Sequence, residues 1–244
     1  AQTTTAVEDG NEWVINGTKI FITNAKFADI YIVFAMTDKS QGTKGISAFI
    51  VPADAKGFSI GKIEDKLGIR GSSTGELIFE DVRIPKDYLL GKIGRGFGIA
   101  MSTLDGGRIG IASQALGISQ GALDETVRYM KERKQFNKPL SAQQGLQWYV
   151  AEMATRIEAA RLLIYNAARL KESGQPFSSE AAMAKLFASE TATFVTHKAI
   201  QLHGGYGYIA EYPVERMYRD ARITEIYEGT SEVQKMVIAA NVIK

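Results

Sequence analysis

The apolar residues change their spacing near residue 95, and this change limits the folds that the chain can adopt. Before it, short apolar runs of strand length are separated by turns that contain Gly and Asp. After it, apolar residues recur every three or four positions over long stretches, which is the spacing of one face of a helix. We therefore predict an α+β chain, with a β domain over residues 1–95 and a helical domain over residues 96–244.

The β domain is expected to be an antiparallel sandwich or barrel, because its strands follow one another with no helical pattern between them. Asn16-Gly17 lies between β-forming residues and predicts a two-residue hairpin turn, since both central residues of that turn need positive φ. Further strands are predicted at Ile30–Met36, Gly45–Val51 and Glu76–Asp81.

The helical domain is expected to be a long antiparallel four-helix bundle. Its helices are predicted from Phe97 to about Arg133, from Leu146 to near Gly174, from a Ser178 or Ser179 cap to Gly204-Gly205, and from about Thr230 to Val242. The first three would each be about 40 to 50 Å long at 1.5 Å per residue. Their alanine-rich stripes leave room for a second bundle to dock, so we expect a homo-oligomer.

The composition excludes several classes of site. The chain has no cysteine and two histidines, His197 and His203. Disulfides and thiolate nucleophiles are therefore excluded, and two isolated histidines are too few for a histidine-built site, so we expect no metal. A net charge of +2 gives no sign of a nucleic-acid-binding surface, and no apolar run is long enough to span a bilayer.

One stretch, Asp220–Gln234, gathers carboxylates beside an aromatic ring and a helix start. The carboxylates are Glu225, Glu228 and Glu232, and the aromatic ring is Tyr227. Gly229-Thr230-Ser231 follows Glu228 directly, where glycine frees the backbone and a hydroxyl can cap the next helix. Because a helix N-terminus attracts anions and polarises a nearby carbonyl oxygen, Glu228 is a candidate general base. An ordinary helix cap with acidic residues in its first turn is the alternative that these residues alone leave open.

A glycine pair, Gly106-Gly107, interrupts the first predicted helix between Asp105 and Arg108. Each glycine inside a helix costs about 1 kcal/mol relative to alanine. Such a cost indicates that another group approaches the backbone closely, either a neighbouring helix or a ligand. We interpret the pair as a candidate ligand contact, and we interpret the later glycines of this helix as helix-packing positions: Gly110, Gly117 and Gly121.

Seven short motifs occur in a fixed order along the chain. They are Ile20–Asn24, Lys66–Arg70, Asp105–Arg108, Arg133–Phe136, Gln201–Gly207, Arg219–Arg222 and Tyr227–Thr230. With the β module followed by long helices, they resemble the acyl-CoA dehydrogenase family of flavoenzymes, and within it the short-chain, butyryl-CoA type. The resemblance implies FAD-dependent conversion of a short-chain acyl-CoA to the trans-2-enoyl-CoA. It also implies a homotetramer built as a dimer of dimers, an electron-transferring flavoprotein as partner, and a place in the bacterial cytoplasm or the mitochondrial matrix.

The resemblance assigns the chemistry to Glu228, which would take the α-proton while flavin N5 takes the β-hydride. The Glu228 backbone N–H and the flavin ribityl chain would bind the thioester carbonyl. Tyr227 would form a wall of the acyl pocket, and Gly229 would let the thioester approach. The implied contacts on the CoA side are Asp105, Gly106, Gly107 and Arg108.

The resemblance also assigns the FAD contacts. Behind the isoalloxazine ring would lie Phe21, Ile22 and Thr23, with Phe21 where many relatives carry tryptophan. Residues that reach a neighbouring subunit's FAD would be Arg133, Gln135, Phe136 and Gln144. The adenosine half would meet Gln201, Leu202, His203, Gly204 and Gly205. The pyrophosphate and ribose would meet the helix start at Thr230, Ser231 and Glu232.

The family has a helical N-terminal domain ahead of the β module, and this sequence begins just after the loop that joins the two. We therefore expect this chain by itself to bind FAD weakly and to turn over slowly. An acyl-CoA oxidase, a decarboxylating acyl-CoA dehydrogenase and a non-catalytic helical assembly subunit are the alternatives. The presence of Glu228, Thr23 and Arg133 argues against the assembly subunit, because a scaffold has no use for that combination.

Overall fold

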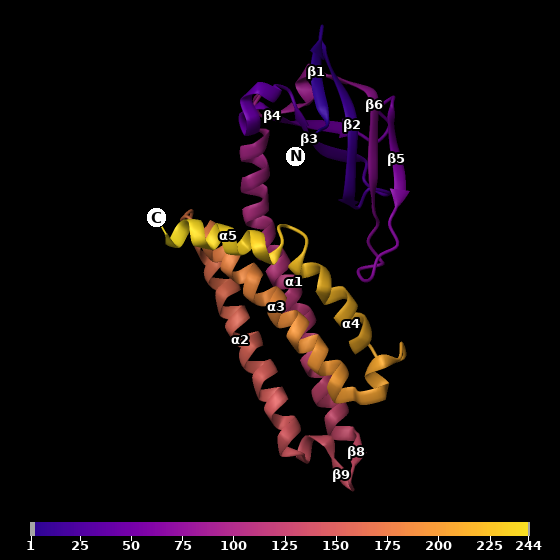
Figure 1. Ribbon diagram of the computed structural model, residues 1–244, viewed down its shortest axis with the longest axis vertical. Coiled ribbons are helices and arrows are strands. Elements are labelled where there is room, and N and C mark those ends of the chain that lie inside the picture. The colour runs from indigo at the N-terminus through magenta and orange to yellow at the C-terminus, as the bar shows by residue number, and fades with distance from the viewer. Residues whose placement is uncertain (1–2, 244) are drawn as a thin grey trace. The chain divides into compact units, whose positions relative to one another are not determined.

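The computed structural model describes residues 3–243, which divide into two compact units between Thr103 and Leu104. The division falls inside the longest helix, α1 (Gly96–Glu132). Strands make up most of the first unit and helices most of the second (Figure 1). This confirms the predicted α+β class, with a β module followed by a helical bundle.

The first unit contains one seven-stranded sheet in the order β5-β6-β2-β1-β3-β4-β7 (Figure 1). Its strands are β1 (Thr5–Asp9), β2 (Glu12–Thr23), β3 (Ile30–Met36), β4 (Ile46–Pro52), β5 (Phe58–Ile63), β6 (Thr74–Pro85) and β7 (Leu89–Leu90). Neighbouring strands pair antiparallel except β1 and β3, which pair parallel through Thr5 and Met36. The sheet is therefore antiparallel, as predicted, at every pairing but one.

Alternation along the strands separates the core of the sheet from its surface. In β3, Tyr31, Val33 and Ala35 are buried whereas Ile30 and Ile32 are exposed. The same period of two buries apolar residues of β2 and β6 into one cluster. Burying one large apolar side chain contributes about 1.5–3 kcal/mol, so this cluster supplies the main driving force for the unit.

The predicted hairpin at Asn16-Gly17 is wrong. Residues 12–23 form the single strand β2, and the first hairpin turns at residues 10 and 11 instead, between Asp9 and Glu12. At Asn16-Gly17 the pairing of β2 with β6 shifts its register between Ile15 and Gly17. The Asn-Gly pair that favours a turn therefore lies opposite a bulge in β6, where Asn16 faces two residues, Glu80 and Asp81.

Contacts across the sheet explain why these two residues stand at the bulge. The Asn16 amide donates to Asp81 Oδ1 at 2.9 Å, and its Oδ1 accepts from the Asp81 backbone N–H at 2.8 Å. Gly17 has φ +136°, and a Cβ at this position would lie 2.7 Å from the Thr4 Cα. Glycine is needed here for a close backbone approach, which a local sequence signal cannot distinguish from a turn.

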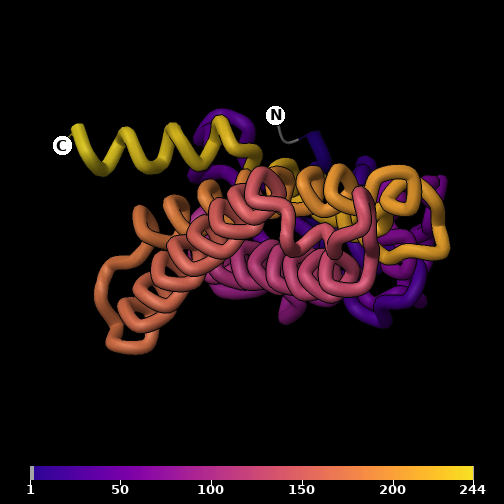
Figure 2. The backbone as a smooth tube through the Cα atoms, turned by 90° about the horizontal axis from the view of Figure 1, so that it is seen from below, coloured from indigo at the N-terminus to yellow at the C-terminus, as the bar shows by residue number. Residues whose placement is uncertain are grey.

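The second unit contains the remaining helices together with a small two-stranded hairpin. Besides the rest of α1 these are α2 (Gln144–Glu172), α3 (Ser178–His203), α4 (Val214–Ala221), α5 (Ser231–Val242), and strands β8 (Lys134–Gln135) and β9 (Lys138–Pro139). Figures 1 and 2 show α1, α2 and α3 side by side. The four predicted helices are confirmed, and α4 is a short helix that the sequence analysis did not predict.

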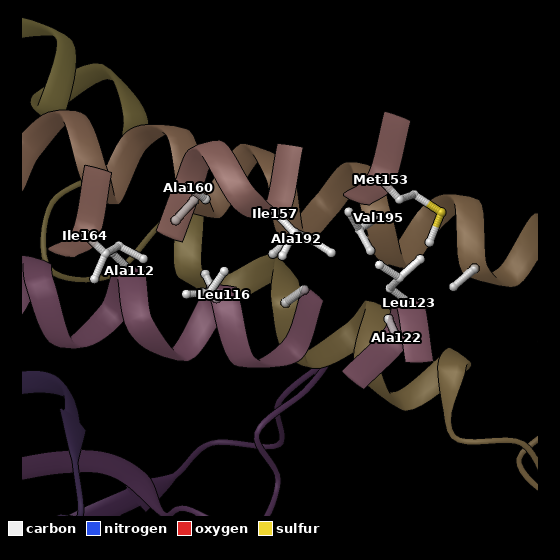
Figure 3. Close-up of a cluster of buried hydrophobic side chains, with 14 of the residues drawn as sticks. Ala112, Leu116, Ala122, Leu123, Met153, Ile157, Ala160, Ile164, Ala192 and Val195 are labelled. Atoms are coloured by element: carbon white, nitrogen blue, oxygen red, sulfur yellow. The ribbon is translucent and has the colours of Figure 1, made fainter. Parts of the chain in front are cut away.

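Side chains from three helices form the core of the bundle (Figure 3). Leu116 and Leu123 of α1 lie against Ile157 and Met153 of α2 and Val195 of α3. Buried alanines fill the positions between them and let the helices approach closely: Ala112, Ala115, Ala122, Ala160, Ala188, Ala192 and Ala199. Residues spaced by three and four positions therefore form one continuous core, as the sequence period predicted.

The helix starts differ from the predictions in one case. Thr230 caps α5, its side chain accepting from the Val233 backbone N–H, as expected. Neither Ser178 nor Ser179 caps α3, because the N-cap residue is Phe177 and it makes no side-chain cap. The Ser178 hydroxyl donates to Asp105 Oδ1 at 2.9 Å instead, so a tertiary contact replaces the local one.

The packing role expected for the later glycines of α1 holds for one of them. A Cβ at Gly121 would touch Met217 Cε at 3.6 Å, whereas a Cβ at Gly110 or Gly117 would meet nothing within 4 Å in the described residues. These two glycines lie on an open face of α1.

Across residues 3–243, none of the helices combines the length and the hydropathy needed to cross a bilayer.

Candidate active site

Glu228 lies in a strained turn between residue 225, the last of a short 3-10 segment, and the start of α5. Its φ is +55°, and that of Gly229 is +92°, so two successive residues adopt the left-handed region. This region costs a non-glycine residue roughly 1–2 kcal/mol. Such a conformation persists only where the surroundings hold it, and it is common in functional sites.

Two buried donors hold the backbone of this turn. The Lys185 ammonium on α3 donates to the Gly229 carbonyl at 2.7 Å. The Gln234 amide on α5 donates to the same carbonyl at 2.9 Å and to the Glu228 carbonyl at 3.2 Å. Both side chains are 0% exposed. The turn is therefore fixed from two different helices.

The Glu228 carboxylate points at Gly107 of α1. A Cβ built on Gly107 would lie 2.6 Å from Glu228 Oε2, which is closer than any real contact of that kind. At Gly106 the corresponding neighbour is the Lys171 ammonium, 3.0 Å away. The glycine at position 107 is thus explained, because the Glu228 carboxylate occupies the space that a side chain at this position would need.

A buried cation lies on the same part of α1. Arg108 is 5% exposed, and its guanidinium donates to Asp105 Oδ1 at 2.5 Å. Asp105 also accepts from Ser178, which ties α1 to α3. The Arg108 Nε is buried without a hydrogen-bond partner in the described residues. Arg108 therefore acts on Glu228 through its charge, in a place with little access to solvent.

Burial and charge act on Glu228 in opposite directions. Burial raises the pKa of its carboxyl above the ordinary glutamate value, and the charges of Arg108 and Lys185 partly offset this rise. Burial also lowers the pKa of Lys185 to about 8, against the opposing effect of Glu225 and Glu228. A partly desolvated carboxylate with a raised pKa is a stronger proton acceptor, which is what a general base needs.

The turn also contributes a free backbone donor. Within residues 3–243 the Glu228 N–H makes no hydrogen bond, although the carbonyls on either side of Gly229 are occupied as described. Beside it, the Tyr227 hydroxyl donates to the Gln114 side chain, and burial raises the Tyr227 pKa. A carboxylate and an unused N–H thus belong to one residue, and a neutral phenol lies next to them.

The neighbouring carboxylate of Glu225 is paired with a cation. Glu225 accepts from the Thr193 hydroxyl and from Arg222, whose guanidinium lies 2.5 Å from Glu225 Oε2. Thr230 caps α5 and Glu232 lies in the first turn of that helix, where hydrogen bonds from its own backbone N–H and from the Thr230 hydroxyl lower the pKa of its carboxyl. The Ser231 hydroxyl is buried without a partner in the described residues. The three expected pyrophosphate residues therefore lie together at the α5 start, directly after the Glu228 turn.

A separate cavity of about 560 Å³ opens at the other end of α3. Seven of the predicted cofactor residues line it: Arg133, Gln135, Gln201, Leu202, His203, Gly204 and Gly205. Phe136 and Gln144, predicted with them, do not line it. Phe136 lies at the tip of the β8–β9 hairpin, 89% exposed and at φ +53°.

His203, one of the residues that line this cavity, has a buried ring nitrogen without a partner in the described residues. Its Nδ1 lies 2.7 Å from the Ala199 carbonyl, so Nδ1 carries the proton. The ring stacks on Tyr129 with 4.2 Å between centroids, and burial lowers the His203 pKa. The Nε2 atom is buried without a partner in the described residues, so it is a hydrogen-bond acceptor that no donor reaches. The Arg133 guanidinium lies 5.3 Å from the Tyr206 ring centroid.

The three cofactor residues predicted in the β domain lie on β2. The ladder between β2 and β6 is irregular between Lys19 and Ile22, and Phe21 has φ +57° and is 68% exposed. Thr23 is the last residue of the strand and is exposed.

Sequence reasoning missed several residues that the structure brings to these sites. They are Gln114, Lys185 and Gln234 around Glu228, and Tyr129 and Tyr206 at the cavity. The sequence does contain one signal for Lys185, since it falls in phase with the buried alanines Ala181, Ala184 and Ala188. A lysine in phase with an apolar stripe is a candidate for a buried, partnered charge.

Two domain models of one protein family match most of this chain. The acyl-CoA dehydrogenase middle-domain model matches residues 1–82, and the acyl-CoA dehydrogenase C-terminal-domain model matches residues 94–243. The chain is 61% identical over 244 residues to a short-chain specific acyl-CoA dehydrogenase of Clostridium acetobutylicum, covering 100% of this chain and 64% of that protein.

Two solved structures resemble the model closely. The TM-score is 0.98, at 54% identity, with butyryl-CoA dehydrogenase from Megasphaera elsdenii. It is 0.99, at 59% identity, with a structure described as the electron transferring flavoprotein of Acidaminococcus fermentans. Each comparison covers 100% of this chain and 64% of the other, so the sequence spans less than two thirds of these relatives.

Proposed function

This chain belongs to the acyl-CoA dehydrogenase family, and we propose that its protein converts a short-chain acyl-CoA to the trans-2-enoyl-CoA. The observation that carries the proposal is the Glu228 turn: a partly buried carboxylate with a raised pKa, fixed opposite Gly107. Residues 1–95 would act as the middle β domain and residues 96–244 as the helical domain. The 61% identical relative is named for short-chain substrates, and this supports the substrate class.

Glu228 would remove the proton on the carbon next to the thioester carbonyl. Negative charge then develops on the carbonyl oxygen, and the unused Glu228 N–H is a donor that can stabilise it. Tyr227 stays neutral and would form one wall of the acyl pocket. Gly229 would let the thioester approach its backbone, whereas the position of a Cβ on it is already taken by Gln234, whose Nε2 would lie 2.7 Å away. The charges of Arg108 and Lys185 favour the ionised form of the base and partly offset the rise in its pKa that burial causes.

The residues of the α3-end cavity fit the adenosine half of FAD. A volume of about 560 Å³ lies in the range of small-molecule sites, and His203 Nε2 is a buried acceptor without a partner in the described residues. Arg133 and Gln135 would reach the FAD of a neighbouring copy of the chain, where Arg133 would pair with the pyrophosphate, and Gln201 would contact the adenosine half. Thr230, Ser231 and Glu232 would meet the pyrophosphate and ribose at the α5 start, and Phe21, Ile22 and Thr23 would meet the flavin ring. When bound, FAD supplies the acceptor for the hydride that leaves the β-carbon.

The exposed Phe136 and the neighbouring Gln144 would reach a cofactor in a second copy of the chain, in a tetramer built as a dimer of dimers. An electron-transferring flavoprotein would accept the electrons. The likeness to the Acidaminococcus fermentans flavoprotein structure supports that class of partner. On the CoA side we place Asp105, Gly106 and Gly107, with Arg108 contributing charge rather than direct contact because its side chain is 6% exposed.

The test is the visible spectrum of the full-length flavoprotein under anaerobic conditions. Butyryl-CoA should bleach the flavin band, and longer acyl-CoAs should bleach it less completely or more slowly. Oxygen consumption by the reduced protein would indicate an oxidase, and CO₂ release from a dicarboxylyl-CoA would indicate a decarboxylating enzyme. A flavin band that no acyl-CoA bleaches would overturn the proposed function.

A further inference from the structure

Lys185 is a wholly buried cation whose hydrogen bond goes to a backbone carbonyl. Its Nζ donates to the Gly229 carbonyl at 2.7 Å, and no carboxylate in residues 3–243 forms a salt bridge with it. Charged groups surround it at longer range, namely Glu225, Glu228, Glu232 and Arg108. Burying an ammonium is costly, and a lysine stays buried only where specific partners compensate it. The partner here is the turn that carries Glu228.

The turn needs such partners because its conformation is strained. Glu228 at φ +55° would relax towards negative φ if nothing held the following peptide groups. That relaxation would rotate the Glu228 side chain away from Gly107 and would redirect its free N–H. Lys185 and Gln234 bind the carbonyls of residues 228 and 229 from two helices, which prevents the rotation.

We propose that Lys185 is a positioning residue for the Glu228 base, acting with Gln234 to hold the 228–229 backbone in the left-handed conformation that directs the carboxylate to Gly107. This inference rests on the proposed function, since it concerns the same base. It assigns to Lys185 no contact with substrate. Its effect is on the rate of proton removal, whereas substrate affinity depends on other residues.

Proton removal can be measured apart from hydride transfer. A 3-thiaacyl-CoA carries sulfur in place of its β-carbon, so it has no β-hydrogen to give up, yet its α-protons can still be removed. NMR in D₂O follows the exchange of these α-protons on the full-length holoprotein. Lys185→Met keeps the unbranched side chain and removes the donor and the charge. Loss of one charged hydrogen bond predicts exchange slower by about tenfold to a hundredfold, with the ligand Kd unchanged within about threefold.

Lys198→Met is the matched control. Lys198 lies on the same helix, with its Nζ 4.5 Å from the Tyr149 ring centroid, and it contacts no residue of the Glu228 turn in the described structure. Its variant should exchange α-protons within twofold of the wild-type rate. Gln234→Met removes the other donor without removing a buried charge, so it should also slow exchange. If Lys185→Met does not fold, the exchange rate of Gln234→Met tests whether the backbone donors position Glu228.

The outcomes separate the two ideas. No α-proton exchange in the wild-type protein would overturn the proposed function, and the inference with it. Exchange in the wild type that Glu228→Gln abolishes, but that a folded Lys185→Met or Gln234→Met variant leaves at the wild-type rate, would overturn the inference alone. An equal loss in Lys198→Met would do the same, because the effect would then not belong to the turn.

Discussion

Gly107 and Glu228 face each other so closely that a methyl group on residue 107 would lie 2.6 Å from Glu228 Oε2. The two residues are far apart in the sequence, and one is on α1 while the other precedes α5. A helix glycine therefore determines where the candidate base can lie, and this relationship gives the first prediction.

Gly107→Ala should displace the carboxylate and lower the rate of dehydrogenation at least about tenfold, the effect of roughly 1.4 kcal/mol on the barrier. Alanine favours a helix interior by about 1 kcal/mol over glycine, so the variant should remain folded. The control is Gly110→Ala on the same helix, where the added methyl meets nothing within 4 Å in the described residues. It should gain stability and keep its activity. Equal activity in both variants would count against the packing of Glu228 on Gly107.

Glu228 should also leave a pH signature in stability. Burial raises its pKa, so the folded state keeps this proton at pH values where an unfolded glutamate, with a pKa of about 4.3, has lost it. Between the unfolded and folded pKa values the folded state binds more protons, so this group makes stability fall as pH rises. Glu228→Gln cannot ionise and escapes that loss. The Tm of Glu228→Gln relative to that of the wild type should therefore rise as pH increases above about 4.3, and a Tm difference that narrows as pH increases would contradict the prediction.

The α3-end cavity can be tested through its cation. Arg133→Met should raise the Kd for FAD by about tenfold or more, because a charge-assisted hydrogen bond contributes about 1.5–3 kcal/mol. Added salt should weaken FAD binding less in this variant than in the wild type. The control is Arg156→Met, since Arg156 lies over the Phe194 ring, away from the cavity. Isothermal titration at two ionic strengths measures both effects, and unchanged affinity in Arg133→Met would remove Arg133 from the cofactor site.

The bundle core makes a stability prediction that is independent of function. Met153 is 0% exposed and packs among α1, α2 and α3 (Figure 3). Met153→Ala should lower the free energy of unfolding by about 2–5 kcal/mol through the lost contacts and the cavity left behind. Met236→Ala, at a side chain 70% exposed, should change it by less than about 0.5 kcal/mol. Urea unfolding followed by circular dichroism compares the two, and similar losses would contradict the assignment of the core.

Sequence patterns predicted the structural elements whose residues repeat at a regular spacing or form a local run. The long helices follow from a period of about 3.6, because many residues contribute to that pattern. Strand β3 follows from a continuous apolar run of strand length. The Thr230 cap follows from a local hydroxyl and a local N–H. The short helix α4 spans only eight residues, and it was missed.

Features that depend on a distant partner could not be predicted from local sequence. Asn16-Gly17 is a strong local turn signal, yet its partner is Asp81 on another strand, and the pairing of β2 with β6 prevails. Ser178 could cap its own helix but binds Asp105 instead. The partner of Lys185, the Gly229 carbonyl, becomes visible only once the turn before α5 lies on α3. The strain at Glu228 is likewise a property of the assembled site.

The role of Glu228 as the base is tested most directly by anaerobic stopped-flow reduction of the flavin with butyryl-CoA and with butyryl-CoA deuterated at its α-carbon. In the wild type, reduction should be fast and should slow with the deuterated substrate. In Glu228→Gln, with flavin still bound, it should be slower by about a hundredfold to ten-thousandfold, the usual contribution of a positioned general base. Reduction of Glu228→Gln within tenfold of the wild-type rate, with the same isotope effect, would contradict the account.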